Sequence, residues 1–374
     1  MYFKINRNYF IDELSKCNRI IDYKNPVPAC TGILIEVETD KISIVSTNSS
    51  VSIKTSTYAN QHDLEIKEAG IFLIRGKNFI EILKRMEDEI ISLNKVETNI
   101  ITLSGNKSEF LLNVLEHTDF PTILFKEEGV FFEVYGSELK KGMNQTIISV
   151  NEWNQKIVLQ GLNFLAEANN FYITGTDGFR VSRKLISLES SVIEKVTANV
   201  PFKSVFEIIK VIDDKQMIKI IVHDNLISIR SKDTIIQSTL LEGQFPDVNG
   251  VFPTDFNSTI FVENKTFYKL ISRADIPSEE NTSTVVNFVL DGDVISIKSN
   301  IQQIGSFEEE FKDFELRGID DQNIYFNSKF ILDSLRSFET KIIEISFIDS
   351  KTPIVIASSE DTSLSQIILP MFSN

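Results

Sequence analysis

The chain has 374 residues and a net charge of −15, with 42% hydrophobic and 24% charged residues. This length exceeds what one hydrophobic core usually serves, and the apolar runs are too short to span a membrane, so several domains of a globular protein are expected. The negative charge argues against a simple basic nucleic-acid binder, and any contact with DNA must therefore be local.

An extended apolar stretch that leads into an amphipathic helix recurs six times along the chain. In chain order, the predicted strands and helices are 2–5 with 6–21, 71–74 with 77–86, 130–134 with 137–148, 197–200 with 201–212, 259–262 with 264–274, and 323–326 with 327–338. When the six helices are taken two at a time along the chain, the second helix of each two begins near 77, 202 and 327, at intervals of 125 residues. This period predicts three similar domains with two helices each.

Each of five predicted helices carries an apolar stripe at the three- and four-residue spacing of one helix face, which predicts packing on a sheet. The stripes are Phe10, Leu14, Cys17 and Ile21; Phe79, Leu83 and Met86; Phe202, Val205, Phe206 and Ile209; Phe267, Ile271 and Ala274; and Ile331, Leu335 and Phe338. Residues 32–45 and 289–297 read as hairpins, because runs of β-branched residues alternate around acidic or Gly-containing turns. The predicted class is α+β, with domains at 1–127, 128–252 and 253–374.

Charge is separated between the helices and the rest of the chain. Within 5–21, 77–86, 137–148, 202–210, 264–274 and 327–338 there are fifteen Lys or Arg against six Asp or Glu, a net of +9 in a chain of −15. A single helix with lysines on its solvated face would mean little. Six such helices predict a shared surface that attracts phosphate without reading base edges.

Other sites are weakly indicated. Cys17 and Cys30 are the two cysteines, and in a chain of this length they are more often buried small hydrophobes than a disulfide or metal site. The three histidines are scattered, and Gly-rich phosphate loops and a Gly-x-Ser-x-Gly motif are missing. Asp177 and the cluster 308–310 are candidate acids, but a turn and a solvated strand explain them better. We expect no catalysis, metal or cofactor.

Three segments resemble the bacterial sliding clamp family, the beta subunit of DNA polymerase III. Residues 174–182, Thr-Gly-Thr-Asp-Gly-Phe-Arg-Val-Ser, are similar to its Ala-Thr-Asp-Gly-His-Arg-Leu-Ala segment. Residues 241–247 resemble its Gly-Arg-Phe-Pro-Asp signature, and 368–371 its closing Val-Met-Pro-Met. The resemblance implies a head-to-tail homodimer of three-domain subunits, closed into a six-domain ring around duplex DNA.

By position, the resemblance implies a set of DNA-facing residues on the helices and in two loops. They are Lys4, Arg7, Lys24, Lys77, Lys84, Lys141, Trp153, Lys203, Lys210, Lys265, Lys269, Arg273 and Arg336. The dimer interface is expected to pair Lys107, Phe110 and Leu112 of the first domain with Ile276, Pro277, Glu308, Glu309 and Glu310 of the third.

The resemblance also implies a hydrophobic pocket between the second and third domains, which takes short peptides from partner proteins. Its positions carry over to Leu159, Thr176, Gly178, Phe179, Arg180, Val181, Pro246, Val251, Asn327, Phe330, Pro353, Ile368, Leu369, Pro370 and Met371. Phe179 replaces the usual His, Gly250 stands where a basic residue is common, and residues 372–374 replace the usual Arg-Leu ending. These departures predict a different peptide preference.

The implied partners are a second copy of the chain, duplex DNA of any sequence, the polymerase III alpha subunit, the clamp loader and other proteins with a clamp-binding motif. The first residues, 1–6, lack the features of a secretory signal, so a cytoplasmic protein without membrane contact is expected. A repeat scaffold that binds proteins alone remains open, with the helix cations as incidental surface. Loss of DNA retention on changing Lys203, Lys269 and Arg273 to Glu would separate the two.

Overall fold

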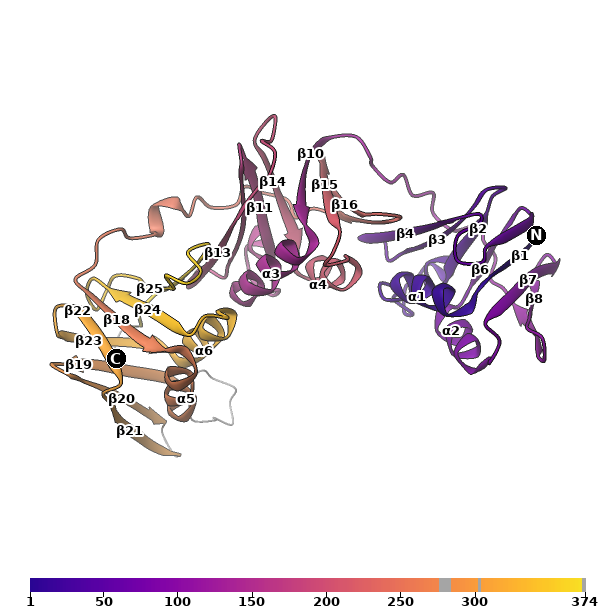
Figure 1. The fold of residues 1–374 in the computed structure, drawn as a ribbon. Helices are drawn as coiled ribbons and strands as arrows, with labels where there is room; N and C mark the ends of the chain where they lie inside the picture. Colours follow the sequence, from indigo (N-terminus) through magenta and orange to yellow (C-terminus); the bar gives the residue numbers. More distant parts are fainter. Residues whose placement is uncertain (276–283, 302–303, 372–374) are drawn as a thin grey trace. The chain divides into compact units, whose positions relative to one another are not determined.

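The computed structural model describes residues 1–275, 284–301 and 304–371. The chain forms two compact units, one from Met1–Ser137 with Phe206–Leu240 and the other from Glu138–Val205 with Leu241–Asn374. In each unit, helices pack on antiparallel sheets (Figure 1), so the α+β prediction is confirmed. Within the described ranges, no helix is both long and apolar enough to cross a membrane.

The described residues contain six α-helices, and each begins at the end of a β-strand or one residue later, as predicted. The pairs are β1 (Tyr2–Asn6) with α1 (Arg7–Asn18), β6 (Gly70–Ile74) with α2 (Gly76–Arg85), β10 (Val130–Tyr135) with α3 (Gly136–Thr146), β14 (Val196–Pro201) with α4 (Phe202–Val211), β18 (Ser258–Glu263) with α5 (Asn264–Ala274), and β23 (Asp321–Asn327) with α6 (Ser328–Ser337). Asn6 and Asn327 cap α1 and α6 by accepting hydrogen bonds from the backbone N–H of Tyr9 and Lys329, which satisfies otherwise unpaired donors.

Unit one holds two antiparallel sheets, with strand orders β5-β1-β7-β8-β9 and β10-β15-β16-β17-β4-β3-β2-β6. The remaining strands are β2 (Ile33–Val37), β3 (Lys41–Thr47), β4 (Val51–Tyr58), β5 (Glu65–Glu68), β7 (Ile90–Glu97), β8 (Ile100–Ser104), β9 (Glu109–Asn113), β15 (Met217–His223), β16 (Leu226–Ser231) and β17 (Thr234–Thr239). The β2–β3 hairpin confirms the prediction for 32–45. Pairing of Ile53 with Ile236 makes the larger sheet continuous between sequence repeats.

Unit two also holds two antiparallel sheets, with orders β14-β11-β12-β13-β26-β25-β24-β18-β22 and β21-β20-β19-β23. The remaining strands are β11 (Gly161–Glu167), β12 (Asn170–Thr176), β13 (Arg180–Ser187), β19 (Val285–Asp291), β20 (Val294–Ile301), β21 (Gly305–Phe311), β22 (Phe314–Gly318), β24 (Ile342–Phe347), β25 (Ile354–Ala357) and β26 (Leu364–Ile368). The β19–β20 hairpin was predicted, and its Gly292 has a φ of +61°. Because β13 pairs with β26, the 177–180 region lies beside the end of the chain.

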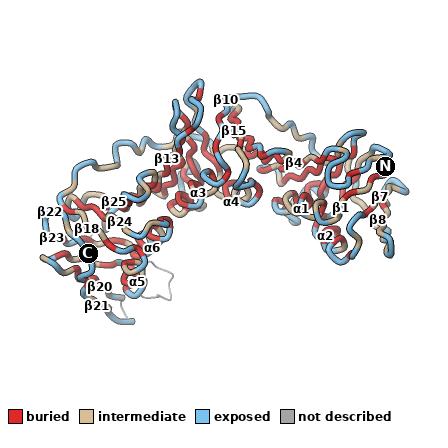
Figure 2. Tube along the Cα trace, viewed as in Figure 1, coloured by how far each residue is buried: buried red, intermediate tan, exposed pale blue. Residues whose placement is uncertain are grey.

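The predicted apolar faces are buried in four of the five striped helices (Figure 2). For α4 the prediction is confirmed only at Val205, which is buried: Phe202, Phe206 and Ile209 are half-buried, and the unselected Ile208 is buried instead. The segment is apolar at so many positions that two overlapping stripes fit the helical period, and the sequence does not choose between them.

Candidate partner-binding cleft and basic helix faces

A tight turn, Asp177–Phe179, joins β12 to β13. Gly178 has a φ of +96°, a left-handed value that glycine adopts without a steric penalty. The Asp177 carboxylate accepts hydrogen bonds from the backbone N–H groups of Phe179 (2.9 Å) and Arg180 (3.1 Å). This hydrogen bonding fixes the turn from within and leaves the Phe179 side chain 64% exposed.

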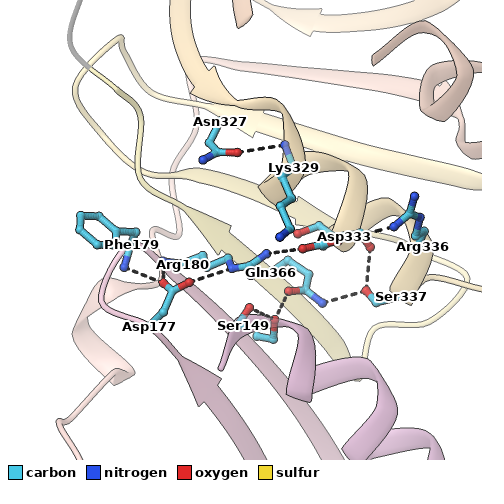
Figure 3. Close-up of polar contacts among 12 residues, drawn as sticks. Ser149, Asp177, Phe179, Arg180, Asn327, Lys329, Asp333, Arg336, Ser337 and Gln366 are labelled. Carbon is cyan, nitrogen blue, oxygen red and sulfur yellow. Dashed lines mark hydrogen bonds and ion pairs between the residues drawn. The ribbon is translucent and has the colours of Figure 1, made fainter. Parts of the chain in front are cut away.

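Arg180 links this turn to α6 (Figure 3). Its side chain is 8% exposed, and its guanidinium donates to Asp177 from Nε at 3.0 Å and to Asp333 from Nη1 at 2.9 Å. The guanidinium carbon also lies 4.3 Å from the centre of the Phe330 ring. Two carboxylates compensate for burying the charge, which is the arrangement a buried cation requires.

Polar contacts also tie the sheet to the helices beneath this turn (Figure 3). The Gln366 amide donates to the Ser337 hydroxyl at 2.8 Å and to the Gln145 carbonyl at 3.3 Å, and it accepts a hydrogen bond from Ser182. The group joins β13, β26, α3 and α6. Such a satisfied buried network holds its elements in one arrangement.

A cavity of ≈ 930 Å³, which we call the cleft, opens beside the turn. Two exposed aromatic side chains form part of its wall, Phe179 at 64% and Trp153 at 78% exposed, and cations lie among them. The lining residues are Val150–Lys156, Leu159, Asp177–Arg180, Phe202, Asn327, Lys329 and Phe330. Apolar side chains such as Leu159, Phe179 and Phe330 share this lining with at least as many polar and charged ones, a mixture that suits a peptide segment with both kinds of side chain.

The structure brings part of the predicted pocket together in the cleft, namely Leu159, Gly178, Phe179, Arg180, Asn327 and Phe330. Other predicted residues lie in the strands beneath, since Thr176, Val181 and Ile368 are 4%, 8% and 0% exposed. The Ile368 side chain belongs to a buried core cluster, so it is not a surface contact.

The end of the chain borders the cleft. The N–H of Leu369 donates to the Phe179 carbonyl at 2.9 Å, and the N–H of Met371 donates to the Tyr325 carbonyl at 2.7 Å. Leu369 and Met371 are 38% and 39% exposed, while Pro370 and Pro353 are half-buried. Residues 372–374 lie outside the described residues.

Two further predicted pocket residues lie outside the cleft lining. Pro246 lines a separate hollow of ≈ 280 Å³ on the same unit, and Val251 is 40% exposed in the short 3-10 helix η4 (Asn249–Val251). Conversely, Asn154, Lys156 and Lys329 line the cleft although sequence reasoning did not select them. The backbone N–H of Lys329 donates to the helix-capping Asn327. An Asn at the start of a predicted helix was therefore the sequence feature that could have drawn attention to Lys329.

The predicted DNA-facing cations divide into free and paired groups. Lys24, Lys77, Lys203, Lys265 and Lys269 are exposed, and the described residues place no carboxylate within ion-pair distance of them. Lys4 and Arg7 are half-buried. Lys203 extends over Trp153, with Nζ 6.0 Å from the ring centre.

The paired cations are held by acids of the same unit. The ammonium groups of Lys84, Lys210 and Lys141 lie 3.0, 3.3 and 3.0 Å from Glu81, Glu207 and Glu339, and Arg336 lies 3.7 Å from Asp333. The Lys84–Glu81 pair is exposed on both sides, and pairs of that kind contribute about 0–1 kcal/mol each. Lys84 therefore stays available to a phosphate, whereas Arg336 contacts an Asp333 side chain that is only 17% exposed.

Arg273 and Glu309 were assigned to different surfaces by sequence, yet they form one ion pair. The Arg273 Nε lies 2.8 Å from a Glu309 carboxylate oxygen, and Nη2 contacts the other. The hydrogen bonds from Arg273 hold the pKa of Glu309 below its usual value. Glu308 is likewise paired, with Lys298 at 2.7 Å.

The predicted interface residues lie on edge strands of two sheets. Phe110 and Leu112 are on β9, at one edge of its sheet, and Glu308–Glu310 are on β21, at one edge of another. Lys107, in the turn before β9, is exposed. Ile276 and Pro277 lie outside the described residues. An edge strand presents unpaired backbone groups to a partner strand.

Metal chemistry has no scaffold in the described part of the chain, where no group of three His, Cys, Asp or Glu side chains is placed to hold an ion. Cys17 and Cys30 are both free and buried. Burial raises the pKa of the Cys17 thiol, so this sulfur remains protonated and unreactive at neutral pH.

Comparison with known proteins covers the whole chain. Models of the DNA polymerase III beta subunit match its N-terminal domain at residues 1–124, its central domain at 133–247 and its C-terminal domain at 249–372. The beta sliding clamp of Mycoplasma capricolum is 36% identical over 100% of this chain and 99% of its own, and that of Staphylococcus aureus is 27% identical over 99% of each.

Solved structures agree. The DNA polymerase sliding clamp of Bacillus subtilis matches with a TM-score of 0.93 at 25% identity, over 100% of both chains. The beta subunit of Streptococcus pyogenes DNA polymerase shares the fold with a TM-score of 0.93 at 24% identity. On the strength of the 36% identity and the three matched domains, this chain belongs to the DNA polymerase III beta subunit family, the beta sliding clamps.

Proposed function

We propose that two copies of this chain close head to tail into a ring around duplex DNA and hold DNA polymerase III and other partners on it. The observation that carries this proposal is the strand-and-helix unit repeated six times with an excess of cations on the helices, in a chain whose net charge is −15. Family membership supports the role, because the relatives are named sliding clamps rather than enzymes. The chain itself performs no catalysis.

DNA contact is proposed for the helix cations, above all the free Lys77, Lys203, Lys265 and Lys269. Flexible ammonium groups neutralise phosphates without fixing the position of the protein along the DNA duplex. The acidic remainder of the chain repels DNA elsewhere. Retention therefore comes from ring closure, while the cations set only a weak, sequence-independent attraction.

The cleft is proposed as the site for partner peptides, including those of the polymerase III alpha subunit and the clamp loader. Burying one Leu or Phe of a partner against Phe179, Leu159 and Phe330 would contribute about 1.5–3 kcal/mol. Contacts of that size suit partners that exchange. The rigid support from Arg180 and Asp333 lowers the entropic cost of binding, because the wall is already in place.

Ring closure is proposed between the edge strands β9 and β21. Among the described strands, each has a neighbour on one side alone, so backbone hydrogen bonds to a second copy are available at both. Lys107 of one copy would then face Glu308–Glu310 of the next. Three domains at 1–127, 128–252 and 253–374 would supply the ring, and the family-model matches ending at 124, 247 and 372 support these boundaries.

Retention on circular DNA tests this function. The protein is placed on a nicked circular plasmid by a bacterial clamp loader, separated from free protein by gel filtration, and then treated with an enzyme that cuts the plasmid once. We expect co-elution with the circle and loss after cutting. Equal retention before and after cutting would contradict encirclement, and failure to load a dimeric protein would favour a protein-binding scaffold without a DNA role.

A further inference from the structure

A polar row crosses the nine-stranded sheet on the face away from the buried Gln366 network. Asn199, Asn163, Thr174 and Arg183 are direct cross-strand partners on β14, β11, β12 and β13, so their side chains share one face. This row lines the ≈ 280 Å³ hollow, which segment 243–249 also lines. We call this cavity the Arg183 hollow.

The amides of this row are satisfied within the chain. Asn163 donates to the Asn199 and Thr197 side-chain oxygens, both at 2.9 Å, and Asn199 donates to the Gly243 carbonyl at 2.9 Å. Asn163, Thr174 and Asn199 are 6%, 3% and 7% exposed. They form a fixed polar floor rather than a set of free donors.

Arg183 is the exception. Among the described residues it makes one hydrogen bond, from Nη1 to the Asn249 side-chain oxygen at 2.8 Å, and its Nε is buried without a partner there. Its guanidinium carbon lies 4.1 Å from the Tyr172 ring centre and 5.7 Å from that of Phe252. The stacked rings hold the guanidinium in place, leaving a charged fork with unused donors.

The charges around Arg183 leave it without a direct counter-ion. In the described residues no carboxylate lies within ion-pair distance, in contrast to Arg180, which has two. Asp247 lines the hollow, but its carboxylate accepts the Asn249 N–H at 2.9 Å, and Lys195 at the wall pairs with Glu167 at 3.2 Å. Burial lowers the pKa of Arg183, while Tyr172 and Asp247 oppose that effect.

An apolar cluster adjoins the guanidinium. Val181 shares the strand face of Arg183 and packs with Val355 and Ile367. Phe252 packs against this cluster and also lies over Arg183. If an extended peptide places an apolar side chain on this cluster, the side chain two residues along the peptide comes within reach of the hollow. Alternate residues of a strand lie about 7 Å apart and point to the same side.

We propose that the Arg183 hollow binds a carboxylate side chain of the partner peptide, and that Arg183 thereby selects acidic partners. The proposal rests on peptide binding as the function of this unit and adds a specificity residue outside the cleft. A guanidinium pairs with a carboxylate through charged hydrogen bonds, and the acid would supply the counter-ion that Arg183 lacks among the described residues.

The test uses synthetic hexapeptides with Leu and Phe at two fixed positions and either Glu or Gln at each remaining position. Binding to the full-length protein is measured by fluorescence anisotropy. At one position we expect the Glu peptide to bind about fivefold more tightly than its Gln counterpart, given the strength of a charged hydrogen bond at a partly exposed site. In Arg183→Gln this ratio falls to one, because the Gln side chain offers the Glu peptide no positive charge.

Arg317→Gln is the matched control, because Arg317 is also stacked on an aromatic ring, with its guanidinium carbon 4.4 Å from the Phe261 ring centre on β18. It should keep the wild-type ratio, and Arg183→Lys should keep part of it. An unchanged Glu preference in Arg183→Gln would overturn the carboxylate site alone. If no peptide binds the wild-type protein, the proposed peptide-binding function fails and the carboxylate site with it.

Discussion

Arg180 and Asp333, 153 residues apart in the sequence, are joined by a 2.9 Å hydrogen-bonded ion pair. One sits where the Asp177–Phe179 turn enters β13, and the other is in α6. Both side chains are largely buried, at 8% and 17% exposed. The turn and α6, which form two walls of the cleft, are therefore held together by an ion pair. Removing either partner leaves the charge of the other less well compensated.

Asp333→Asn should lower the apparent thermal midpoint. The change leaves Arg180 with one carboxylate and weakens the Arg336 contact, and removing one partner of a part-buried pair costs about 1–3 kcal/mol. Asp313→Asn is the control, since Asp313 is exposed and has no described partner. Differential scanning calorimetry measures both. Equal midpoints for the two variants would show that the pair contributes nothing.

Phe179→Ala should weaken peptide binding by about tenfold and leave the thermal midpoint unchanged, because the ring is 64% exposed in the free protein and would be buried only in the complex. Phe131→Ala, which removes a ring that is 48% exposed elsewhere in the chain, should leave the affinity unaltered. Isothermal titration with a hydrophobic hexapeptide measures the affinity. Equal affinities for both variants would remove Phe179 from the binding surface.

Lys265→Ala and Lys269→Ala should reduce the salt dependence of DNA binding more than Arg273→Ala does. The two lysines are unpaired in the described structure, whereas Arg273 already holds Glu309. Each phosphate contact removed lowers the slope of log K against log salt by about 0.9. Anisotropy with a fluorescent duplex, across a salt series, measures the slope. A larger effect from Arg273→Ala would mean that DNA displaces the Glu309 pair.

Asp361→Asn should be destabilising at neutral pH and nearly neutral in acid. Burial alone would raise the pKa of Asp361, but hydrogen bonds from Ser363 and Lys184 outweigh it and hold the pKa below the usual value. The folded state thus favours the ionised form, so its contribution is present above the unfolded pKa of about 3.9 and is lost as pH falls through the folded value. Urea midpoints of wild type and variant, compared from pH 7 down into acid below the unfolded pKa, should converge. A constant gap would rule out this titration.

The strand-and-helix pairs could be predicted from sequence because every helix follows an extended apolar stretch and five of the six carry an apolar stripe. The turn at Asp177-Gly178 was equally readable, since Gly178 needs its positive φ. The Arg180–Asp333 and Arg273–Glu309 pairs could not be read. Their partners are 153 and 36 residues apart, and nothing in a single sequence says which charges meet in space.

Site positions carried by the family resemblance had mixed outcomes. Phe179 and Phe330 line the cleft, whereas Ile368 is a core residue and Pro246 lines the Arg183 hollow. Motif position fixes the strand on which a residue lies, but burial depends on which face the neighbouring segments cover. For the same reason the predicted buried face of α4 is confirmed only at Val205.

The mass of the purified protein in solution, measured by light scattering over a dilution series, tests ring closure most directly. Two chains of 42.6 kDa predict a species of about 85 kDa that persists to low concentration. Leu112→Lys, on the edge strand β9, should shift the mass toward the monomer. A wild-type protein that remains at 42.6 kDa at micromolar concentration would contradict a self-closing ring.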